Sequence, residues 1–238
     1  MKRKRVKGFL AMRASLEENE ERGQSGRKKK TPLEAEVPFE VVIGISGASG
    51  VIYGMRLLEV LSEMGWTTHL VMTDSARKII EIETDKTASE VEAMASYVHS
   101  TKDFTAPVAS GSYLFRAMVV APCSMKTLAG IANGFTDTLI TRAADVCLKE
   151  RRRLILVPRE SPLCLIHLNN MVKVTEAGGV ILPPCPGFYS RPQNLDEIVD
   201  SVVGRALDLM GANHDLYRRW SPSLSGNVYN DEKQIEKR

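Results

Sequence analysis

The chain has 238 residues, of which 43% are hydrophobic and 26% are charged, and its formal net charge is +3 at pH 7. This composition is typical of a globular protein with one well-formed core. No segment approaches the roughly 18 uninterrupted apolar residues of a membrane span, so we expect a soluble protein with no membrane partner.

Positive charge is concentrated at the start of the chain. Residues 1–30 hold eleven of the 32 Lys and Arg residues but only four of the 29 Asp and Glu residues, so this segment carries +7 and the rest −4. The basic start is not followed by the apolar segment of a secretory signal, and the glutamates between residues 17 and 21 are unlike an acid-poor mitochondrial presequence. We expect residues 1–38 to form a basic disordered arm, or in part an over-long start with Met12 as the alternative. The mildly acidic remainder does not predict nucleic-acid binding.

Cysteine and histidine are too scattered to form a metal site. The cysteines form no C-x-x-C pair, and the four histidines are not closely paired. We therefore predict no metal, and a reducing, cytoplasmic location. The cysteines are Cys123, Cys147, Cys164 and Cys185.

The first predicted element is a strand, Val41–Ser46, followed by a glycine-rich loop and a helix over Val51–Met64. Such a loop presents backbone N–H groups and the positive end of a helix dipole to an anion, usually a phosphate. Its G-x-x-G-x-x-G spacing over residues 44–50 differs from the dinucleotide fingerprint and the P-loop, and neither of its serines lies in a nucleophile elbow. The loop predicts a phosphate site, with a purely structural turn as the alternative.

Short apolar strands and helical segments alternate along the rest of the chain. Further strands are predicted over Thr67–Thr73, Ala117–Ala121, Leu154–Val157 and Gly179–Leu182. Further helices are predicted over Ala76–Ile82, Ser89–Val98, Ser124–Ala132, Asp137–Lys149, Leu163–Glu176 and Leu195–Met210. This alternation predicts an α/β fold with a doubly wound, mostly parallel sheet.

Polar or proline-rich sequence follows every predicted strand. The five strand ends read S-G-A-S-G, T-D-S, A-P-C-S-M-K-T, V-P-R-E-S-P and L-P-P-C-P-G-F-Y. Ligands of parallel sheets bind at the carboxyl ends of the strands, so we predict one composite site there. The alternative is that these loops are polar only because they face solvent.

Several motifs in a fixed order extend from Phe39 to Trp220. They include G-I-S-G-A-S-G-V-I-Y-G, E-T-D, A-P-C-S-M-K-T-L-A-G-I-A, R-A-A-D-V-C-L-K-E-R-R, L-V-P-R-E-S-P, P-G-F-Y and R-R-W. In this order they resemble the flavin prenyltransferases of the UbiX/Pad type, within the flavodoxin-like superfamily of FMN-binding decarboxylases. The resemblance implies a Rossmann/flavodoxin-like three-layer sandwich over residues 39–220, which leaves 221–238 as a polar tail.

The resemblance also implies a reaction. A dimethylallyl group moves from dimethylallyl phosphate to N5 and C6 of reduced FMN without a metal, and the prenyl-FMN formed is the cofactor of a UbiD-type decarboxylase. Members of the family assemble as homododecamers with sites at subunit junctions. The sequence leaves open whether the donor is the monophosphate or the diphosphate.

Site residues follow from the resemblance, position by position. Contacts to FMN are implied for Gly47, Ala48, Ser49, Thr73, Ser124, Met125, Lys126, Thr127 and Arg142. Contacts to the donor phosphate, some from neighbouring subunits, are implied for Lys149, Arg159, Glu160, Tyr189 and Arg205. Catalytic roles are implied for Ser49 and Glu83 in removing the C6 proton, for Glu160 in proton movement, and for Trp220 in lining the prenyl pocket with Tyr189.

Individually, several of these residues have plain alternatives. Arg142 could pair with Asp145 on its own helix, and Lys149 could lie at a helix end that faces solvent. Glu83 could be an ordinary surface charge, and Trp220 could anchor the tail by packing on a neighbouring residue.

Two rival functions differ in what they require. A peptidyl-cysteine decarboxylase of the same superfamily needs a histidine shortly after the first loop, where this chain has V-I-Y-G-M-R. A non-catalytic FMN carrier, serving as accessory subunit of an aromatic-acid decarboxylase, would have no reason to keep a second phosphate site.

Overall fold

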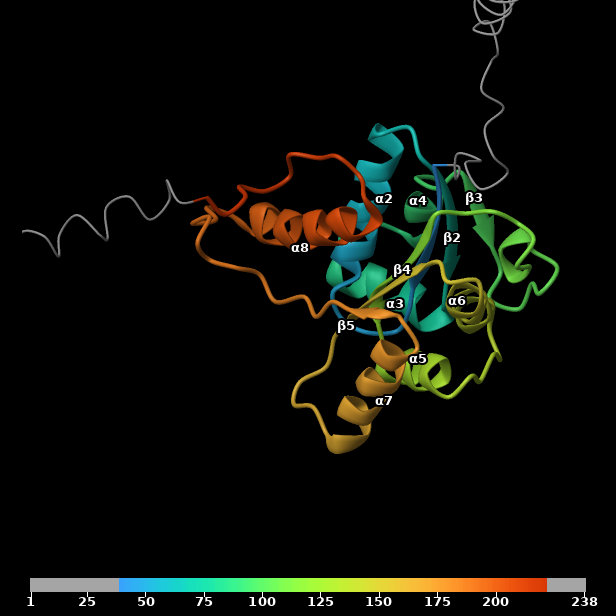
Figure 1. Cartoon of the computed structure of the whole chain (residues 1–238). Coiled ribbons are helices and arrows are strands. Elements are labelled where there is room, and N and C mark those ends of the chain that lie inside the picture. Colours follow the sequence, from blue (N-terminus) through green and yellow to red (C-terminus); the bar gives the residue numbers. More distant parts are fainter. Residues whose placement is uncertain (1–38, 222–238) are drawn as a thin grey trace, which may run out of the picture. The chain divides into compact units, whose positions relative to one another are not determined.

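The computed structural model describes residues 39–221, and these residues contain one six-stranded, all-parallel sheet. Its strand order is β3-β2-β1-β4-β5-β6 (Figure 1). The strands are β1 (Glu40–Ile45), β2 (Thr67–Met72), β3 (Tyr97–His99), β4 (Ala117–Cys123), β5 (Arg153–Pro158) and β6 (Val180–Ile181). The predicted doubly wound parallel sheet is confirmed.

Helices cover both faces of the sheet (Figure 1). They are α2 (Val51–Glu63), α3 (Asp74–Glu83), α4 (Ala88–Glu92), α5 (Met125–Ala132), α6 (Leu139–Lys149), α7 (Leu165–Glu176) and α8 (Leu195–Met210), with a 3₁₀ turn η3 (Pro107–Ala109). Within the described part of the chain, no helix is long and apolar enough to cross a membrane.

The central strands are apolar on both sides because each side meets helices. Ile43 and Ile45 of β1 pack in the core that α2 and α8 cover, whereas Val42 packs in the core that α5 and α6 cover. All three side chains are fully buried. Continuous apolar runs of this kind are typical of parallel strands enclosed between two helical layers.

The strand order reverses between β1 and β4. From β1 the chain continues through α2 to β2 on one side, and from β4 it continues through α5 and α6 to β5 on the other. The chain therefore continues in opposite directions along the sheet after β1 and after β4, and open parallel sheets bind ligands at such a point. The loops after these two strands carry the predicted glycine-rich segment and A-P-C-S-M-K-T.

One predicted element is wrong. The helix predicted over Ser89–Val98 ends at Glu92 as α4, and Tyr97–His99 instead forms a sixth strand beside β2. Ser96 and Thr68 exchange backbone-to-hydroxyl hydrogen bonds of 3.0 and 3.1 Å, which hold the strand in place. Pairing with β2 thus overrides a weak local helical pattern.

The predicted arm 1–38 and the predicted tail beyond its first residue lie outside the described residues.

Candidate functional site

The loop after β1 is joined directly to the loop after β4. The buried Ser46 hydroxyl donates to the Pro122 carbonyl at 3.0 Å and accepts from the Ser124 N–H at 2.8 Å. Gly47 lies against α3, since a Cβ built on it would stand 2.6 Å from the Ser75 Cβ. The ends of β1 and β4 and the start of α3 therefore meet at one place.

Three helices begin at this edge of the sheet. Thr73 caps α3 by accepting from the Ala76 N–H at 3.1 Å, and Ser124 caps α5 by accepting from the Thr127 N–H at 3.3 Å. The third helix, α2, follows Gly50, which has φ 97°. Helix N-termini carry partial positive charge and free N–H groups, so their convergence favours an anion such as a phosphate.

Hydrogen-bond donors remain available at this edge. Among the described residues, the N–H groups of Gly47 and Ser49 and the hydroxyls of Thr73 and Thr127 donate to no acceptor. The Ala48 N–H differs, because it donates to the Ser46 carbonyl at 2.8 Å. Four donors beside three helix N-termini suit the phosphate of FMN, so the residues present fit this group.

The α2 N-terminus is itself occupied by a carboxylate from a distant part of the chain. Glu83 Oε2 accepts from the Gly50 N–H at 2.8 Å and from the Val51 N–H at 3.3 Å. The Glu83 side chain is exposed, yet these two bonds hold it at the glycine-rich loop rather than free in solvent. One of its two donors, Gly50, directly follows Ser49 in the sequence.

A second cluster lies beyond the carboxyl end of β6. A hollow of about 200 Å³ is lined by Tyr189 and Arg205 together with Cys185 and Tyr217. The rings of Tyr189 and Trp220 meet edge to face, with centroids 5.5 Å apart. The structure thus groups three of the predicted residues around one hollow that contains a cation and aromatic faces.

Tyr53 of α2 lies beside the glycine-rich loop. A Cβ on Gly50 would lie 3.2 Å from the Tyr53 ring. Burial, with a smaller effect of the nearby Cys185, raises the pKa of Tyr53. The hollow and the cradle both lie past the carboxyl ends of strands of the same parallel sheet, so they share one edge of it.

Arg159 and Glu160 lie at the same edge of the sheet. They directly follow β5, and the Arg159 N–H donates to the Cys123 carbonyl at 3.2 Å, beside Ser124. Both side chains are exposed, and Glu160 Oε1 accepts from the Ser161 N–H at 3.0 Å.

Arg142 and Lys149 on α6 are not brought into these clusters within one copy of the chain. Arg142 donates to Asp145 at 2.8 Å and to the Ala109 carbonyl at 3.1 Å, as in the plain alternative for this residue. Lys149 pairs with Glu150 at the end of α6, just before β5 begins. It therefore lies at the opposite edge of the sheet from Arg159, which follows the same strand.

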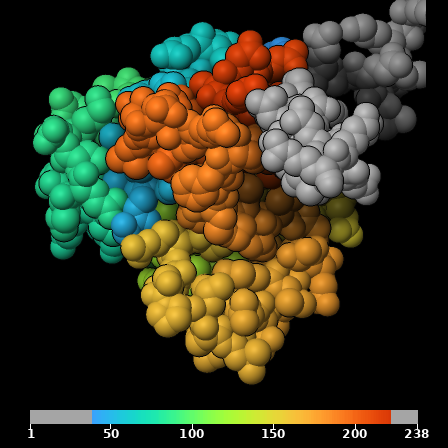
Figure 2. All heavy atoms as spheres, turned by 90° about the vertical axis from the view of Figure 1, so that its left-hand side faces the viewer, coloured from blue at the N-terminus to red at the C-terminus, as the bar shows by residue number. Residues whose placement is uncertain are grey.

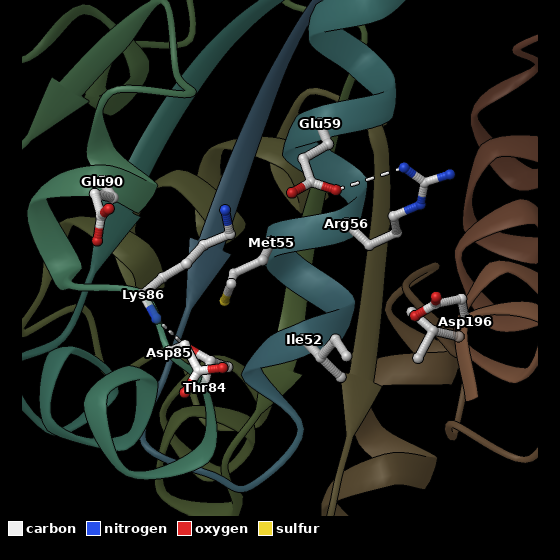
Figure 3. A pocket seen from close by; sticks show the side chains of 10 residues that line it. Ile52, Met55, Arg56, Glu59, Thr84, Asp85, Lys86, Glu90 and Asp196 are labelled. Atoms are coloured by element: carbon white, nitrogen blue, oxygen red, sulfur yellow. Dashed lines mark hydrogen bonds and ion pairs between the residues drawn. The ribbon is translucent and has the colours of Figure 1, made fainter. Parts of the chain in front are cut away.

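A larger hollow of about 690 Å³ contains none of the predicted site residues (Figure 3). It lies between α2, α8 and the connection from α3 to α4, and it is lined by Arg56 and Lys86 against four acidic side chains. Arg56 is already paired with Asp200 at 2.7 Å and Glu59 at 3.5 Å. The excess of negative charge makes this hollow unsuitable for a phosphate.

Two residues that shape the site were not singled out from the sequence. Ser46 joins the two loops, and Ser75 packs against Gly47. The signal for Ser46 was its place at the end of a buried strand, where a polar residue needs a hydrogen-bond partner. Nothing local in the sequence indicates the contact at Ser75.

Comparison with known proteins places this geometry among flavin-binding proteins. A family model described as Flavoprotein matches residues 29–207. The flavin prenyltransferase UbiX of Escherichia coli K12 is 50% identical over 183 residues, which are 76% of this chain and 97% of that protein.

Two solved structures are similar over almost their whole length. The crystal structure of AnUbiX (PadA1) in complex with FMN and dimethylallyl pyrophosphate has a TM-score of 0.75 and 49% identity, covering 76% of this chain and 97% of that one. A dodecameric FMN-dependent Ubix-like decarboxylase from Escherichia coli O157:H7 has a TM-score of 0.75 and 48% identity, covering 76% and 99%.

Proposed function

The chain belongs to the flavoprotein family that includes the UbiX flavin prenyltransferases, and from this premise we propose that it transfers a dimethylallyl group from dimethylallyl phosphate to N5 and C6 of reduced FMN. The observation that carries the proposal is the pair of sites at one edge of the sheet, an anion cradle at the strand-order reversal and an arginine-containing aromatic hollow beyond β6. A flavin prenyltransferase needs two phosphate sites, whereas a simple FMN carrier needs one.

The cradle would hold FMN. We assign its phosphate to the four donors left available in the glycine-rich loop and at the starts of α3 and α5, because charge-assisted hydrogen bonds to backbone N–H groups are strong. Bound there, reduced FMN supplies the nucleophilic N5 and C6 positions. The proposed FMN contacts are Gly47, Ala48, Ser49, Thr73, Ser124, Met125, Lys126, Thr127 and Arg142. Arg142 keeps one guanidinium nitrogen, Nη2, that donates to no acceptor among the described residues.

The hollow would hold the prenyl donor. Arg205 and Tyr189 line it, and a guanidinium offers two parallel donors to a phosphate. These groups would stabilise the phosphate as its negative charge grows on leaving. Tyr189 and Trp220 would face the allyl group, where aromatic rings stabilise developing cationic character and exclude water.

Three further residues complete the donor site in this proposal. Arg159 and Glu160 extend from the end of β5, at the same edge as the cradle. Because Lys149 lies at the opposite edge in its own copy, we propose that it reaches the donor phosphate of a neighbouring copy. The site would then be complete only in an assembly.

Proton transfer is proposed for two carboxylates. Glu83, held beside the loop by the Gly50 and Val51 N–H groups, would accept with Ser49 the proton that is lost from C6 when the second bond forms. Glu160 would deliver a proton to the departing phosphate within the network that includes Arg159.

A homododecamer is the proposed assembly, as in the Ubix-like structure from Escherichia coli O157:H7. Four large apolar side chains of α7 support burial against another copy, since they are 45–71% exposed in one copy: Leu165, Ile166, Leu168 and Val172. Figure 2 shows α7 (gold) on an open part of this face, below the orange and red segment that follows β6.

We further propose that the product passes to a UbiD-type decarboxylase, and that the enzyme works in the cytoplasm. The free thiols of Cys164 and Cys185 are exposed and unpaired with each other, which supports a reducing compartment.

The donor reaction can be measured without isolating the flavin. Purified full-length protein would be incubated anaerobically with reduced FMN and either dimethylallyl monophosphate or diphosphate, and released phosphate and pyrophosphate would be quantified. We expect anion release that requires reduced FMN and is lost in Arg205→Ala. FMN binding without release from either donor would contradict prenyl transfer and favour a carrier.

A further inference from the structure

The segment after α8 folds back along the helix and is fastened to it at one carboxylate. After Gly211, with φ 75°, the chain reverses, and we call residues 212–221 the strap. Asp208 accepts hydrogen bonds from His214 Nε2 at 3.0 Å, from the Tyr217 hydroxyl at 2.6 Å and from Arg219 Nη2 at 2.7 Å. One aspartate therefore binds three side chains of the strap.

The same carboxylate also contacts the proposed phosphate ligand. Arg205 Nη1, one turn earlier on α8, donates to Asp208 Oδ2 at 3.0 Å. Arg205 also interacts with the Tyr217 side chain, which raises the pKa of the arginine. The orientation of the guanidinium is thus tied to Asp208 and to the strap.

Burial and charge both favour a fixed arrangement. The Asp208 side chain is 16% exposed. Burial opposes its ionisation, but hydrogen bonds from Arg219, Tyr217 and His214 outweigh that effect and hold the pKa of this carboxyl well below its usual range. The carboxylate is therefore charged whenever the protein is folded near neutral pH, and its hydrogen bonds are of the strong, charge-assisted kind.

The helix also provides space for the strap. A Cβ on Gly204 would lie 2.4 Å from Tyr217 Cδ1 and 2.8 Å from His214 Cε1. Any larger residue would push both rings away from α8, since carbon atoms pack at about 3.5–4.0 Å.

The strap ends at the prenyl pocket. Tyr217 lines the hollow together with Tyr189 and Arg205, and Trp220 packs edge to face on Tyr189. Asp208 does not line the hollow itself, so any effect on the donor must act through these neighbours.

We propose that Asp208 is a positioning residue for prenyl transfer, which orients Arg205 toward the donor phosphate and fastens the strap that holds Trp220 against Tyr189. The proposal rests on the proposed function. The alternative is a purely structural role, in which Asp208 only stabilises the end of α8 and has no effect on the donor.

The test compares two identical substitutions on one helix. Asp208→Asn removes the charge on α8 that fastens the strap, and the matched control Asp200→Asn removes the charge that pairs α8 with Arg56 of α2 at 2.7 Å. In steady-state assays of the full chain, we expect Asp208→Asn to raise KM for dimethylallyl phosphate about tenfold. FMN affinity should stay within about twofold, and the control should leave KM unchanged.

A second readout follows the strap directly. Trp66 is buried and Trp220 is 62% exposed, so acrylamide quenching of fluorescence reports mainly on Trp220. We expect quenching to increase in Asp208→Asn and in Gly204→Ala, which displaces Tyr217 by a different route, but not in Asp200→Asn.

Three results would overturn the proposal. They are an unchanged KM in folded Asp208→Asn, an equal KM rise in Asp200→Asn, or Trp220 quenching that neither Asp208→Asn nor Gly204→Ala alters. A wild-type protein without transferase activity would contradict the proposed function instead, and the quenching comparison would still test how the strap is held.

Discussion

Replacing Gly47 with alanine tests whether close contact between the first loop and α3 builds the anion cradle. The added Cβ would stand 2.6 Å from the Ser75 Cβ, about 1 Å closer than carbon atoms pack. Relief requires the loop and α3 to separate by about that amount. Overpacking of this kind costs about 1–3 kcal/mol in unfolding free energy.

The same displacement should weaken FMN binding. The Gly47 and Ser49 N–H groups are the proposed phosphate donors, and they lie on the segment that must move. We expect Gly47→Ala to raise the Kd for FMN about 10- to 100-fold, measured by quenching of flavin fluorescence on titration. Urea unfolding of the flavin-free protein gives the stability change in parallel.

Ser75→Gly supplies the rescue. Without the serine side chain, the nearest Ser75 atom to the new Cβ is the backbone Cα, at 3.8 Å, an ordinary packing distance. Ser75→Gly alone should cost no more than about 0.5 kcal/mol through lower helix propensity. The double variant should therefore be more stable, and bind FMN more tightly, than the sum of the single changes predicts. Strictly additive effects, or FMN binding within about twofold of wild type in Gly47→Ala, would refute the reasoning.

Three further predictions concern other parts of the molecule. Glu83→Gln keeps an oxygen for the Gly50 N–H but removes the base, so kcat for prenyl transfer should fall at least about 100-fold with little change in FMN affinity; equal kcat would contradict the proposed role. Ile166→Asp places a charge on the exposed apolar side of α7, so light scattering should show a smaller assembly, while Ser89→Asp on α4 should not; an intact assembly would contradict burial of this face. Burial lowers the pKa of His69 below its ordinary 6.5, outweighing the opposite effect of Glu40, and burial also lowers the pKa of His99. The folded protein therefore favours the neutral form of both histidines. Their contribution to the free energy of unfolding is complete above about pH 6.5 and is lost as the pH falls below it. Urea unfolding at about pH 7.5 and about pH 5.5 should show this loss, and His69→Gln should reduce it; an unchanged pH dependence would contradict it.

The central strands and their helices could be predicted from the sequence because burial on both faces leaves a clear pattern. The strands at β1, β2, β4 and β5 are apolar runs that end in proline, serine or threonine, and the structure begins and ends them within one or two residues of the predicted bounds. β3 could not be predicted in this way. It has only three residues, and its conformation depends on pairing with β2 and on hydrogen bonds between Ser96 and Thr68.

The site was predictable only in part, for a related physical reason. Strand ends indicate where a ligand binds, so Thr73 and Ser124 could be expected together at one edge. Contacts between residues distant in sequence, such as Glu83 with Gly50, are properties of the folded chain. The position of Lys149 at the opposite edge follows from the direction of α6, and motif order alone does not reveal it.

The mass of the flavin after reaction tests the central claim most directly. Purified protein would be incubated anaerobically with reduced FMN and dimethylallyl monophosphate, and the released flavin would be analysed by mass spectrometry. The account predicts a gain of one C5 prenyl unit (C₅H₈), which is lost in Glu160→Gln. FMN that binds and returns with unchanged mass, with the monophosphate and with the diphosphate, would contradict it.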